Sequence, residues 1–355
     1  KPVSPLTGMP FETAFLQGGK GALTMSIDFT KSTQYSSAFA VLSQSQDGAP
    51  EGELMGKPPE NLPNRLSHQP ARALERYRDY PCDQAIGHSS YYRLPQKNAK
   101  SVITVYDFTY EKFFRTHQKI IHSWQKNRAI LKADAVICIS ESTRSDLFKY
   151  VPDVSREKVH VVHLGINRPF LEVLSSLGTQ ELPAEHPYFI YVGARSTYKN
   201  FMPVLHALEH RVEHLICVGG GEFTLEENRA IYKFARGRVH HIAWADDITL
   251  AQLYQQAIAL VFPSLYEGFG IPVVEAMACR CPVIAMNESS IPEVAGQAGY
   301  LLPEINSRSL NAAFNAVTDP VKRTEMVELG FQRAKSFSWE SCCEQTMQIY
   351  SQLIM

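Results

Sequence analysis

Short apolar, β-prone runs recur along most of this chain, and their spacing constrains the fold more than any other feature. In the second half they begin about every 17 to 26 residues, which leaves room for a helix between one run and the next. Strands that alternate with helices are typical of βαβ units around a parallel sheet. The sequence therefore predicts an α/β protein with helices on both faces of its sheets. The runs lie at residues 101–106, 135–139, 159–163, 188–192, 214–218, 239–243, 257–262, 282–286 and 299–302.

The length of 355 residues is enough for about two domains of this kind. The stretch 167–187 contains Gly178, Pro183 and Pro187 but no clear strand, so it is the best candidate for a hinge between them. Residues 337–355 are expected to form a terminal helix, because apolar side chains recur there at steps of three and four. We expect this apolar face to pack into a core. Its members are Trp339, Cys343, Met347, Tyr350 and Leu353.

Residues 1–98 are polar and are broken by glycine and proline. A Ser/Gln-rich stretch spans residues 32–46, and a Gly/Pro-rich stretch spans residues 48–63. Such compositions are typical of loops. We therefore expect loops in this region and place no strands in it.

Charge and cysteine content exclude several classes of function. The net charge is −1, which gives neither the basic footprint of a nucleic-acid-binding protein nor a polybasic membrane signal. No apolar run is long enough to cross a membrane. Seven cysteines, an odd number, and a first segment without a signal-peptide pattern favour a reducing, cytoplasmic location. The cysteine pairs at 279/281 and 342/343 lack zinc-site spacing, so no metal site is predicted.

Chemistry-bearing residues are densest at 261–275, which read VFPSLYEGFGIPVVE. A β-run ends at Phe262, a glycine-bearing loop follows, and Pro272 stands where a first helical turn would begin. In open α/β sheets, ligands bind beyond the carboxyl ends of strands, where helix N-termini offer unpaired N–H groups. Glu267 would lie in this loop, and Glu275 would lie near the first helical turn, where a carboxylate can accept hydrogen bonds from two hydroxyls. A simple turn or a helix-dipole partner explains each feature alone, so only their combination indicates a ligand site.

Two further segments follow strands in the same way. Residues 188–200 read YFIYVGARSTYKN, in which Gly193 allows a close approach of the main chain, while Arg195 and Lys199 suit a diphosphate. Basic residues in loops are more often simply solvated. Residues 216–223 read ICVGGGEF and lack the GxGxxG spacing, which argues against a dinucleotide site.

Together these segments resemble the donor-binding half of the family 4 retaining glycosyltransferases, which have the GT-B fold. The resemblance covers about residues 101–355 and is carried by YVGARSTYKNF, VFPSLYEGFGIPVVEAMACRCPVIA, SSIPEVAGQAGYLLPE and FSWE. It implies two Rossmann-like domains that face a cleft. The expected organisation is an N-terminal acceptor-binding domain at 1–166, a nucleotide-sugar donor-binding domain at 167–336, and a C-terminal helix at 337–355 that packs back on the first domain.

The resemblance also implies a role for each candidate site residue. Glu275 occupies the place of the glutamate that holds the ribose hydroxyls of the nucleotide, and Glu267 that of the glutamate beside the transferred sugar. Arg195 and Lys199 match the basic pair on the donor diphosphate. The implied catalytic residues are Glu267, Arg195 and Lys199. The implied donor-binding residues are Gly193, Gly219, Gly220, Gly268, Phe269, Gly270, Ile271 and Glu275.

The first half carries a fainter resemblance to the acceptor side of the same enzymes, in DQAIGHSSYY, ITVYDF, ADAVICISESTRSDL and HLGIN. It implies His88, Tyr106 and Asp107 as acceptor-side residues. Tyr106 stands where many relatives have a histidine, which puts proton handling by this residue in question. Arg280 stands where a glycine is usual, which would alter that turn or add a positive charge near the donor. The family's Gly-rich first strand and loop are not recognisable at the N-terminus.

The function implied is a retaining hexosyltransferase that uses a nucleotide-sugar donor and no other cofactor. We expect it to be metal-independent, because the chain has no Asp-x-Asp pair that would clamp a metal on the diphosphate. The sequences of the segments YKNF and EGFGIP are most similar to those of bacterial mannosyltransferases of polysaccharide assembly. This resemblance favours GDP-mannose over a UDP-hexose as the donor. The acceptor would be a glycan on a lipid carrier or a lipopolysaccharide precursor, reached by peripheral contact with the cytoplasmic face of the inner membrane.

Other functions stay open at this point. A glucan synthase-like enzyme and a phosphorylase share the architecture, although a pyridoxal-phosphate phosphorylase usually needs a much longer chain. A nucleotide-sugar-binding protein that has lost catalysis is a different class, with the departure at Tyr106 as its sequence support. An NAD-dependent enzyme is disfavoured by the missing fingerprint.

Overall fold

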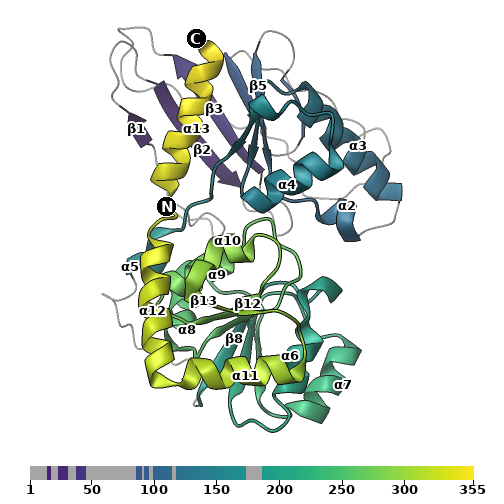
Figure 1. Ribbon diagram of the computed structural model, residues 1–355, viewed down its shortest axis with the longest axis vertical. Coiled ribbons are helices and arrows are strands. Elements are labelled where there is room, and N and C mark those ends of the chain that lie inside the picture. The colour runs from purple at the N-terminus through teal and green to yellow at the C-terminus, as the bar shows by residue number, and fades with distance from the viewer. Residues whose placement is uncertain are drawn as a thin grey trace, which may run out of the picture.

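Two helix-covered sheets lie one above the other along the long axis of the molecule (Figure 1). The structure is a computed structural model that describes residues 14–16, 23–30, 37–44, 85–89, 92–95, 99–113, 117–172 and 186–355. The Gly/Pro-rich stretch at 48–63 and most of the expected hinge lie outside these residues.

The lower sheet has six parallel strands in the order β10-β9-β8-β11-β12-β13. All six predicted runs of this half are confirmed as strands. The chain starts in the middle of the sheet, moves to one edge, returns, and moves to the other edge, which is the strand order of a dinucleotide-binding domain. The strands are β8 Tyr188–Val192, β9 His214–Val218, β10 Val239–Ile242, β11 Leu260–Phe262, β12 Val283–Met286 and β13 Gly299–Leu302.

Helices cover both faces of this sheet, which explains why its strands read as continuous apolar runs. Along β8, Tyr188 and Ile190 pack against α5, α8, α9 and α10, whereas Phe189 and Tyr191 pack against α6, α7 and α11. The helical elements are α5 Arg168–Glu172, η3 Thr197–Lys199, α6 Phe201–Ala207, α7 Leu225–Phe234, α8 Asp247–Gln256, α9 Ile271–Ala278, α10 Ile291–Ala295, η4 Gly296–Ala298, α11 Ser307–Thr318 and α12 Pro320–Ala334.

The upper sheet has seven strands in sequence order, β1 to β7. The last four are parallel, and the strands predicted at 101–106, 135–139 and 159–163 are confirmed among them. The first three are antiparallel and form one edge. The strands are β1 Ala14–Leu16, β2 Leu23–Thr30, β3 Ser37–Gln44, β4 Ile86–Ser89, β5 Lys100–Val105, β6 Ala135–Cys138 and β7 Val159–Val161. The helical elements are α2 Thr109–Phe113, α3 His117–Lys132, α4 Glu141–Tyr150 and η1 Arg156–Lys158.

Strand β3 corrects the prediction of a loop at 32–46. Its sequence is SAFAVLSQ, so the serines and glutamine that marked the stretch as polar only flank a strand-forming centre. Composition over fifteen residues concealed this short apolar segment.

The terminal helix α13, Trp339–Ile354, crosses back to the upper sheet as predicted (Figure 1). Its side chains Cys343, Met347 and Tyr350 are buried with Ile86 and Val102 of that sheet. The crossing is tight where the chain passes Gly165, since a Cβ on this residue would lie 2.2 Å from the backbone nitrogen of Trp339. Ile166 forms a parallel bridge with Ser338 at the same place. The two chain segments that join the sheets therefore run side by side.

Candidate active site

The order of the lower sheet reverses between β8 and β11, which are neighbours through Leu260 and Ile190. In open α/β sheets a crevice forms at such a point, outside the carboxyl ends of the two strands. The loop after β8 carries Gly193, Arg195 and Lys199, and the loop after β11 carries the segment from Glu267. The two densest sequence segments thus meet at the place where this fold binds ligands.

Lys199 and Glu267 are brought together there. The Lys199 Nζ donates a hydrogen bond to Glu267 Oε1 at 2.5 Å, and the two side chains are 17% and 16% exposed. A further bond joins the two loops, from the backbone N–H of Leu265 to the carbonyl of Tyr198 at 2.9 Å. The backbone carbonyl of Glu267 accepts hydrogen bonds from the hydroxyl of Ser289 at 2.6 Å. These bonds hold the Lys199–Glu267 ion pair in place, and both side chains remain partly exposed to a ligand.

The guanidinium of Arg195 is engaged within the protein. Its side chain is only 3% exposed, and Nε donates to Glu227 Oε1 at 3.0 Å. The other nitrogens of the guanidinium donate to the carbonyls of Gly219, Gly221 and Glu222, at 3.0, 2.6 and 2.9 Å. This arrangement uses four of the five N–H donors of the guanidinium within the protein. In this structure Arg195 organises the glycine-rich loop, and the structure does not place it beside Lys199 as a second free cation.

The glycine-rich loop requires glycine for its backbone and for its space. Gly219, Gly220 and Gly221 have φ values of 79°, 77° and 74°, in the left-handed region. A Cβ on Gly220 would lie 2.7 Å from the carbonyl oxygen of Gly193. By contrast, no atom lies within 4 Å of the Cβ positions of Gly193 and Gly219, so a ligand can approach the main chain closely at both.

Glu275 lies on α9 and accepts a hydrogen bond from the hydroxyl of Tyr254 at 3.1 Å. Burial raises the pKa of Glu275 to about 7, the bond from Tyr254 opposes this shift, and the carboxylate of Asp247 adds to it. The side chain is half-buried. A carboxylate held in this way gains from hydroxyl donors, because they replace the water that burial removes.

The loop between Glu267 and α9 contacts the upper domain. The carbonyl of Gly268 accepts hydrogen bonds from the hydroxyls of Ser140 at 2.7 Å and Thr143 at 3.1 Å. Gly270 caps α9 with a φ of 101°. Phe269 is buried, while Ile271, the first residue of α9, is exposed. The side chain of Phe269 therefore belongs to the core. A ligand at this loop would contact its main chain and not the side chain of Phe269.

Two of the three acceptor-side residues lie at the same junction. Tyr106 follows β5, and its carbonyl oxygen would lie 1.9 Å from a Cβ on Gly268. Burial raises the pKa of Tyr106 to about 12, so the phenol stays protonated near neutral pH. The Asp107 carboxylate accepts a hydrogen bond from the backbone N–H of Thr109 at 3.0 Å, at the start of α2.

His88 lies at a different place, inside the upper domain. One ring nitrogen is hydrogen-bonded with the hydroxyl of Tyr350 on α13, and the other lies 2.8 Å from the hydroxyl of Thr104. Burial lowers the pKa of His88 to about 4, so the ring is neutral at physiological pH. His88 is therefore engaged between β5 and α13 within the upper domain.

Comparison with known proteins identifies the family. The model "Glycosyltransferase Family 4" matches residues 39–168, and the model "Glycosyl transferases group 1" matches residues 178–333. One match covers most of the upper domain and the other covers the lower one. The chain belongs to the family 4 glycosyltransferases. A third model, "Flagellar basal body protein FlaE D2 domain", matches residues 1–49 and overlaps the antiparallel strands β1 to β3.

Similar proteins agree with this assignment. The O-antigen chain mannosyltransferase B of Escherichia coli is 29% identical over 309 residues, which cover 81% of this chain and 79% of that protein. The alpha-maltose-1-phosphate synthase of Mycolicibacterium smegmatis is 30% identical over 260 residues, which cover 65% and 66%. The crystal structure of HepE from Anabaena in complex with UDP-glucose has a TM-score of 0.60 at 19% identity and covers 72% of each chain. The glycosyltransferase thus has the GT-B fold of two Rossmann-like domains.

The glycosyltransferase contains functional contacts that sequence reasoning missed. The Glu293 carboxylate accepts hydrogen bonds from the backbone N–H groups of Glu141 at 2.9 Å and Ser142 at 3.3 Å, and lies 2.6 Å from His163 Nε2. These bonds lower the pKa of Glu293. A carboxylate of the lower domain therefore binds the N-terminus of α4 in the upper one. The segment SSIPEV contained this glutamate, but no sequence pattern points to its partner.

Lys126 and Glu111 form a second such contact, an ion pair of 2.7 Å that is almost fully buried. Lys126 Nζ also donates to the carbonyl of Asp107 at 3.1 Å. Burial lowers the pKa of Lys126, and the Glu111 carboxylate opposes this. The pair holds the acceptor-side segment in place.

Glu227, the partner of Arg195, was also missed, although the capping box of α7 that it forms with Thr224 is visible in the sequence.

Arg280 corrects the expectation of a positive charge near the donor. Its guanidinium lies 4.0 Å from the ring of Phe331 and 3.6 Å from the Glu328 carboxylate, both on α12. Arg280 adopts a left-handed φ of 59°, the backbone conformation for which glycine is favoured, so this angle gives no sign of an altered turn. This backbone costs a residue with a side chain about 1–2 kcal/mol, which explains why a glycine is usual here.

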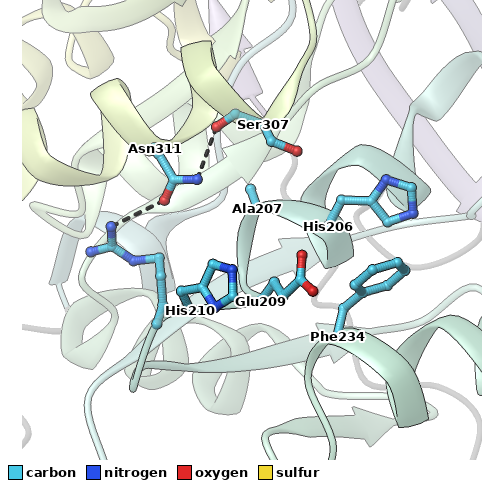
Figure 2. Close-up of a pocket in the computed structure, with 8 residues that line it drawn as sticks. His206, Ala207, Glu209, His210, Phe234, Ser307 and Asn311 are labelled. Atoms are coloured by element: carbon cyan, nitrogen blue, oxygen red, sulfur yellow. Dashed lines mark hydrogen bonds between the residues drawn. The ribbon is translucent and has the colours of Figure 1, made fainter.

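A cavity of about 420 Å³ lies apart from these residues, between α6, α7 and α11 (Figure 2). Asn311 bridges the carbonyl of Ser307 and the guanidinium of Arg211 at its edge. Arg211 is also paired with Glu213 at 2.6 Å. Arg211, Asn311 and Ser307 are therefore engaged with one another, and none of the predicted site residues lines this cavity.

Within the ranges described, no group of three or more His, Cys, Asp or Glu side chains could hold a metal ion. In the same part of the chain, no helix combines the length and the apolar character that a membrane span requires.

Proposed function

We propose that this glycosyltransferase retains the anomeric configuration, needs no metal, and transfers a hexose from a nucleotide diphosphate sugar to a glycan in polysaccharide or lipopolysaccharide biosynthesis. The observation that carries the proposal is the Lys199–Glu267 pair at the point where the strand order reverses, 2.5 Å apart and partly exposed. A donor that enters there meets a cation, a carboxylate and open main chain at Gly193. Residues 1–166 and α13 would bind the acceptor, and residues 167–336 the donor.

Sugar transfer requires that the negative charge on the departing diphosphate be stabilised. Lys199 Nζ supplies a full positive charge, and the main chain at Gly193 and Gly219 supplies close contacts. Arg195 acts on this site through the glycine-rich loop that it holds. Glu275, when ionised, accepts hydrogen bonds from the two ribose hydroxyls.

Glu267 would lie beside the transferred sugar and accept hydrogen bonds from its hydroxyls. The acceptor hydroxyl attacks from the same face on which the diphosphate leaves, and the donor's phosphate oxygen takes its proton. Tyr106 is not assigned as a base, because its phenol is protonated near neutral pH. Contact between the domains at Gly268 excludes water that would hydrolyse the donor.

Mannose from GDP-mannose is favoured, because the similarity to the O-antigen chain mannosyltransferase B extends over 81% of this chain. A UDP-hexose donor is the second candidate, supported by the UDP-glucose complex of HepE. The likeness to an alpha-maltose-1-phosphate synthase keeps a glucan synthase-like activity as the alternative function.

We also propose that the acceptor is linked to a lipid and that the upper domain touches the cytoplasmic face of the inner membrane. Trp124 on α3 is 66% exposed, and Leu131 and Lys132 are exposed on the same helix. Exposed aromatic and aliphatic side chains beside a lysine suit the interface between headgroups and acyl chains.

The test combines binding and turnover. A thermal-shift screen against GDP, UDP, ADP and TDP identifies the base, because a ligand stabilises the fold by RT ln(1 + [L]/Kd). Transfer from labelled GDP-mannose and UDP-glucose is then measured for the wild type and for Lys199→Met, with the exposed Lys233→Met as a matched control. We expect Lys199→Met to lower kcat by about 10²-fold or more. Near-normal turnover in this variant would refute the proposed site, and NMR of the product tests retention.

A further inference from the structure

Each member of the Lys199–Glu267 pair directly follows a tyrosine that contacts the opposite domain. The ring of Tyr198 stacks on Phe113 of α2, with 4.7 Å between centroids and 17° between planes. The ring of Tyr266 lies 5.8 Å from the same phenylalanine. Two loops of the donor domain therefore meet one ring of the acceptor domain, next to the residues that carry the chemistry.

Tyr266 is held more deeply than Tyr198. It is 2% exposed and is buried in the core of the upper domain with Ile103, Val105 and Phe108. Its hydroxyl accepts a hydrogen bond from the backbone N–H of Phe108 and donates one to the Asp146 carboxylate, both at 2.8 Å. A donor-domain side chain is thus a member of the acceptor-domain core, with its hydroxyl satisfied on both sides.

These bonds connect two short segments. On the donor side, Tyr266 is followed by Glu267 and by Gly268, whose carbonyl accepts bonds from Ser140 and Thr143. On the acceptor side, Phe108 follows Tyr106 and Asp107. Contacts on both sides of Glu267, at Tyr266 and at Gly268, therefore set its position relative to the acceptor-side segment.

We propose that Tyr266 is a positioning residue for sugar transfer: its hydroxyl sets the distance between the donor loop and the acceptor-side segment, and this distance determines whether the sugar passes to the acceptor or to water. The inference rests on the proposed function. In either outcome the bond from the anomeric carbon to the phosphate oxygen breaks, and the diphosphate leaves with the electron pair. A bond forms to the acceptor oxygen or to water, and the proton goes to the departing phosphate oxygen.

The experiment compares Tyr266→Phe with Tyr188→Phe. Tyr188 is an equally buried tyrosine whose hydroxyl donates to the carbonyl of Leu253 at 2.8 Å, entirely within the lower domain. With labelled GDP-mannose, or UDP-glucose, and methyl α-mannoside, we expect Tyr266→Phe to lower kcat for transfer about tenfold. KM for the donor stays within about twofold, because its binding groups are untouched. The hydrolysed share of the donor rises severalfold, whereas Tyr188→Phe leaves this share unchanged.

Two variants at Asp146 provide the same test if Tyr266→Phe does not fold. Asp146→Asn keeps an oxygen that accepts the hydrogen bond from the tyrosine hydroxyl. We therefore expect it to transfer the same share of the donor sugar to the acceptor as the wild type. Asp146→Ala lacks this oxygen and behaves like Tyr266→Phe. An unchanged ratio of transfer to hydrolysis in Tyr266→Phe or in Asp146→Ala, or an equal change in Tyr188→Phe, overturns the inference.

Amide hydrogen exchange separates this inference from the proposed function, because it needs no activity. Exchange at Phe108 and at residues 267–270 accelerates in Tyr266→Phe and not in Tyr188→Phe. If the wild type transfers from neither donor while exchange responds in this way, the proposed function fails and the partition between acceptor and water fails with it, while the hold of Tyr266 on the loop at 267–270 stands. Unchanged exchange at 267–270 in Tyr266→Phe overturns the positioning role whatever the activity.

Discussion

A methyl group at Gly268 should separate the two domains at the reacting centre. A Cβ on this residue would lie 1.9 Å from the carbonyl oxygen of Tyr106 and 3.2 Å from the Cβ of Asp107. Because carbon and carbonyl oxygen normally stay about 3.3 Å apart, Gly268→Ala has to displace backbone from backbone by about 1.4 Å. That displacement also lengthens the bonds that Ser140 and Thr143 donate to the Gly268 carbonyl.

The expected effect is on kcat. A misplacement of about 1 Å at a reacting centre costs about 10²-fold in rate, and we expect that loss in kcat for transfer. Nucleotide affinity should change less than about threefold, because the groups assigned to the nucleotide lie in one domain. Steady-state kinetics and isothermal titration with the free nucleotide measure the two quantities.

Gly330→Ala is the matched control. It adds the same methyl group on α12, where the nearest atom is Cγ of the flexible Met277 side chain at 3.2 Å. Gly330→Ala should retain the kcat of the wild type. A folded Gly268→Ala enzyme with wild-type kcat would refute the reasoning, since the domains would then not meet at Gly268 during turnover.

Three further substitutions test other parts of the structure. Arg195→Lys cannot reproduce the fork to Glu227 and the glycine-rich loop, and should lower the free energy of unfolding in urea by about 3 kcal/mol. Glu275 has a pKa raised from 4.5 to about 7, so the native state holds the extra proton, and the free energy of unfolding of the wild type relative to Glu275→Gln should fall by about 3 kcal/mol as pH rises through that window. Burial of His88 gives an opposite slope in both proteins, so the difference between them isolates Glu275. Gly165→Ala forces a Cβ against the backbone of Trp339 and should cost about 2–3 kcal/mol.

Each of the three has an outcome that contradicts it. A stability of Arg195→Lys within about 0.5 kcal/mol of wild type would mean that the glycine-rich loop does not depend on the guanidinium. For Glu275, a difference in unfolding free energy between the wild type and Glu275→Gln that stays constant between pH 4.5 and 7 would contradict its burial. Gly165→Ala with normal stability would show that the crossing segment has room to move.

The parallel strands from β5 onward could be predicted because they form continuous apolar runs, whereas the parallel strand β4 was missed. The run at 257–262 was predicted too long, since Ala257 ends α8 before β11 begins. The antiparallel strands were missed because short apolar centres such as that of β3 lie within polar sequence. Local pattern therefore located the strands that carry the site and missed those at the opposite edge of the molecule.

The candidate site was predictable only in part. Lys199 and Glu267 each follow a strand, but their contact across 68 positions depends on β8 and β11 being neighbours. The engagement of Arg195 with Glu227 depends on how α7 packs beside the loop after β8, which the residue types do not determine. The hydrogen bond of His88 could not be predicted, because its partner on α13 is 262 residues away. Residue types thus indicated the chemistry, while tertiary packing decided which groups are free to perform it.

The return of α13 to the upper sheet has a consequence for synthesis on the ribosome. The apolar side chains of Ile86, Val102, Ala135 and Ile137 are covered by α13, which is made after the whole lower domain. Until that helix leaves the exit tunnel, this surface is exposed to chaperones and to other nascent chains. The core of the upper domain is therefore completed only after the lower domain has been synthesised and α13 has left the exit tunnel.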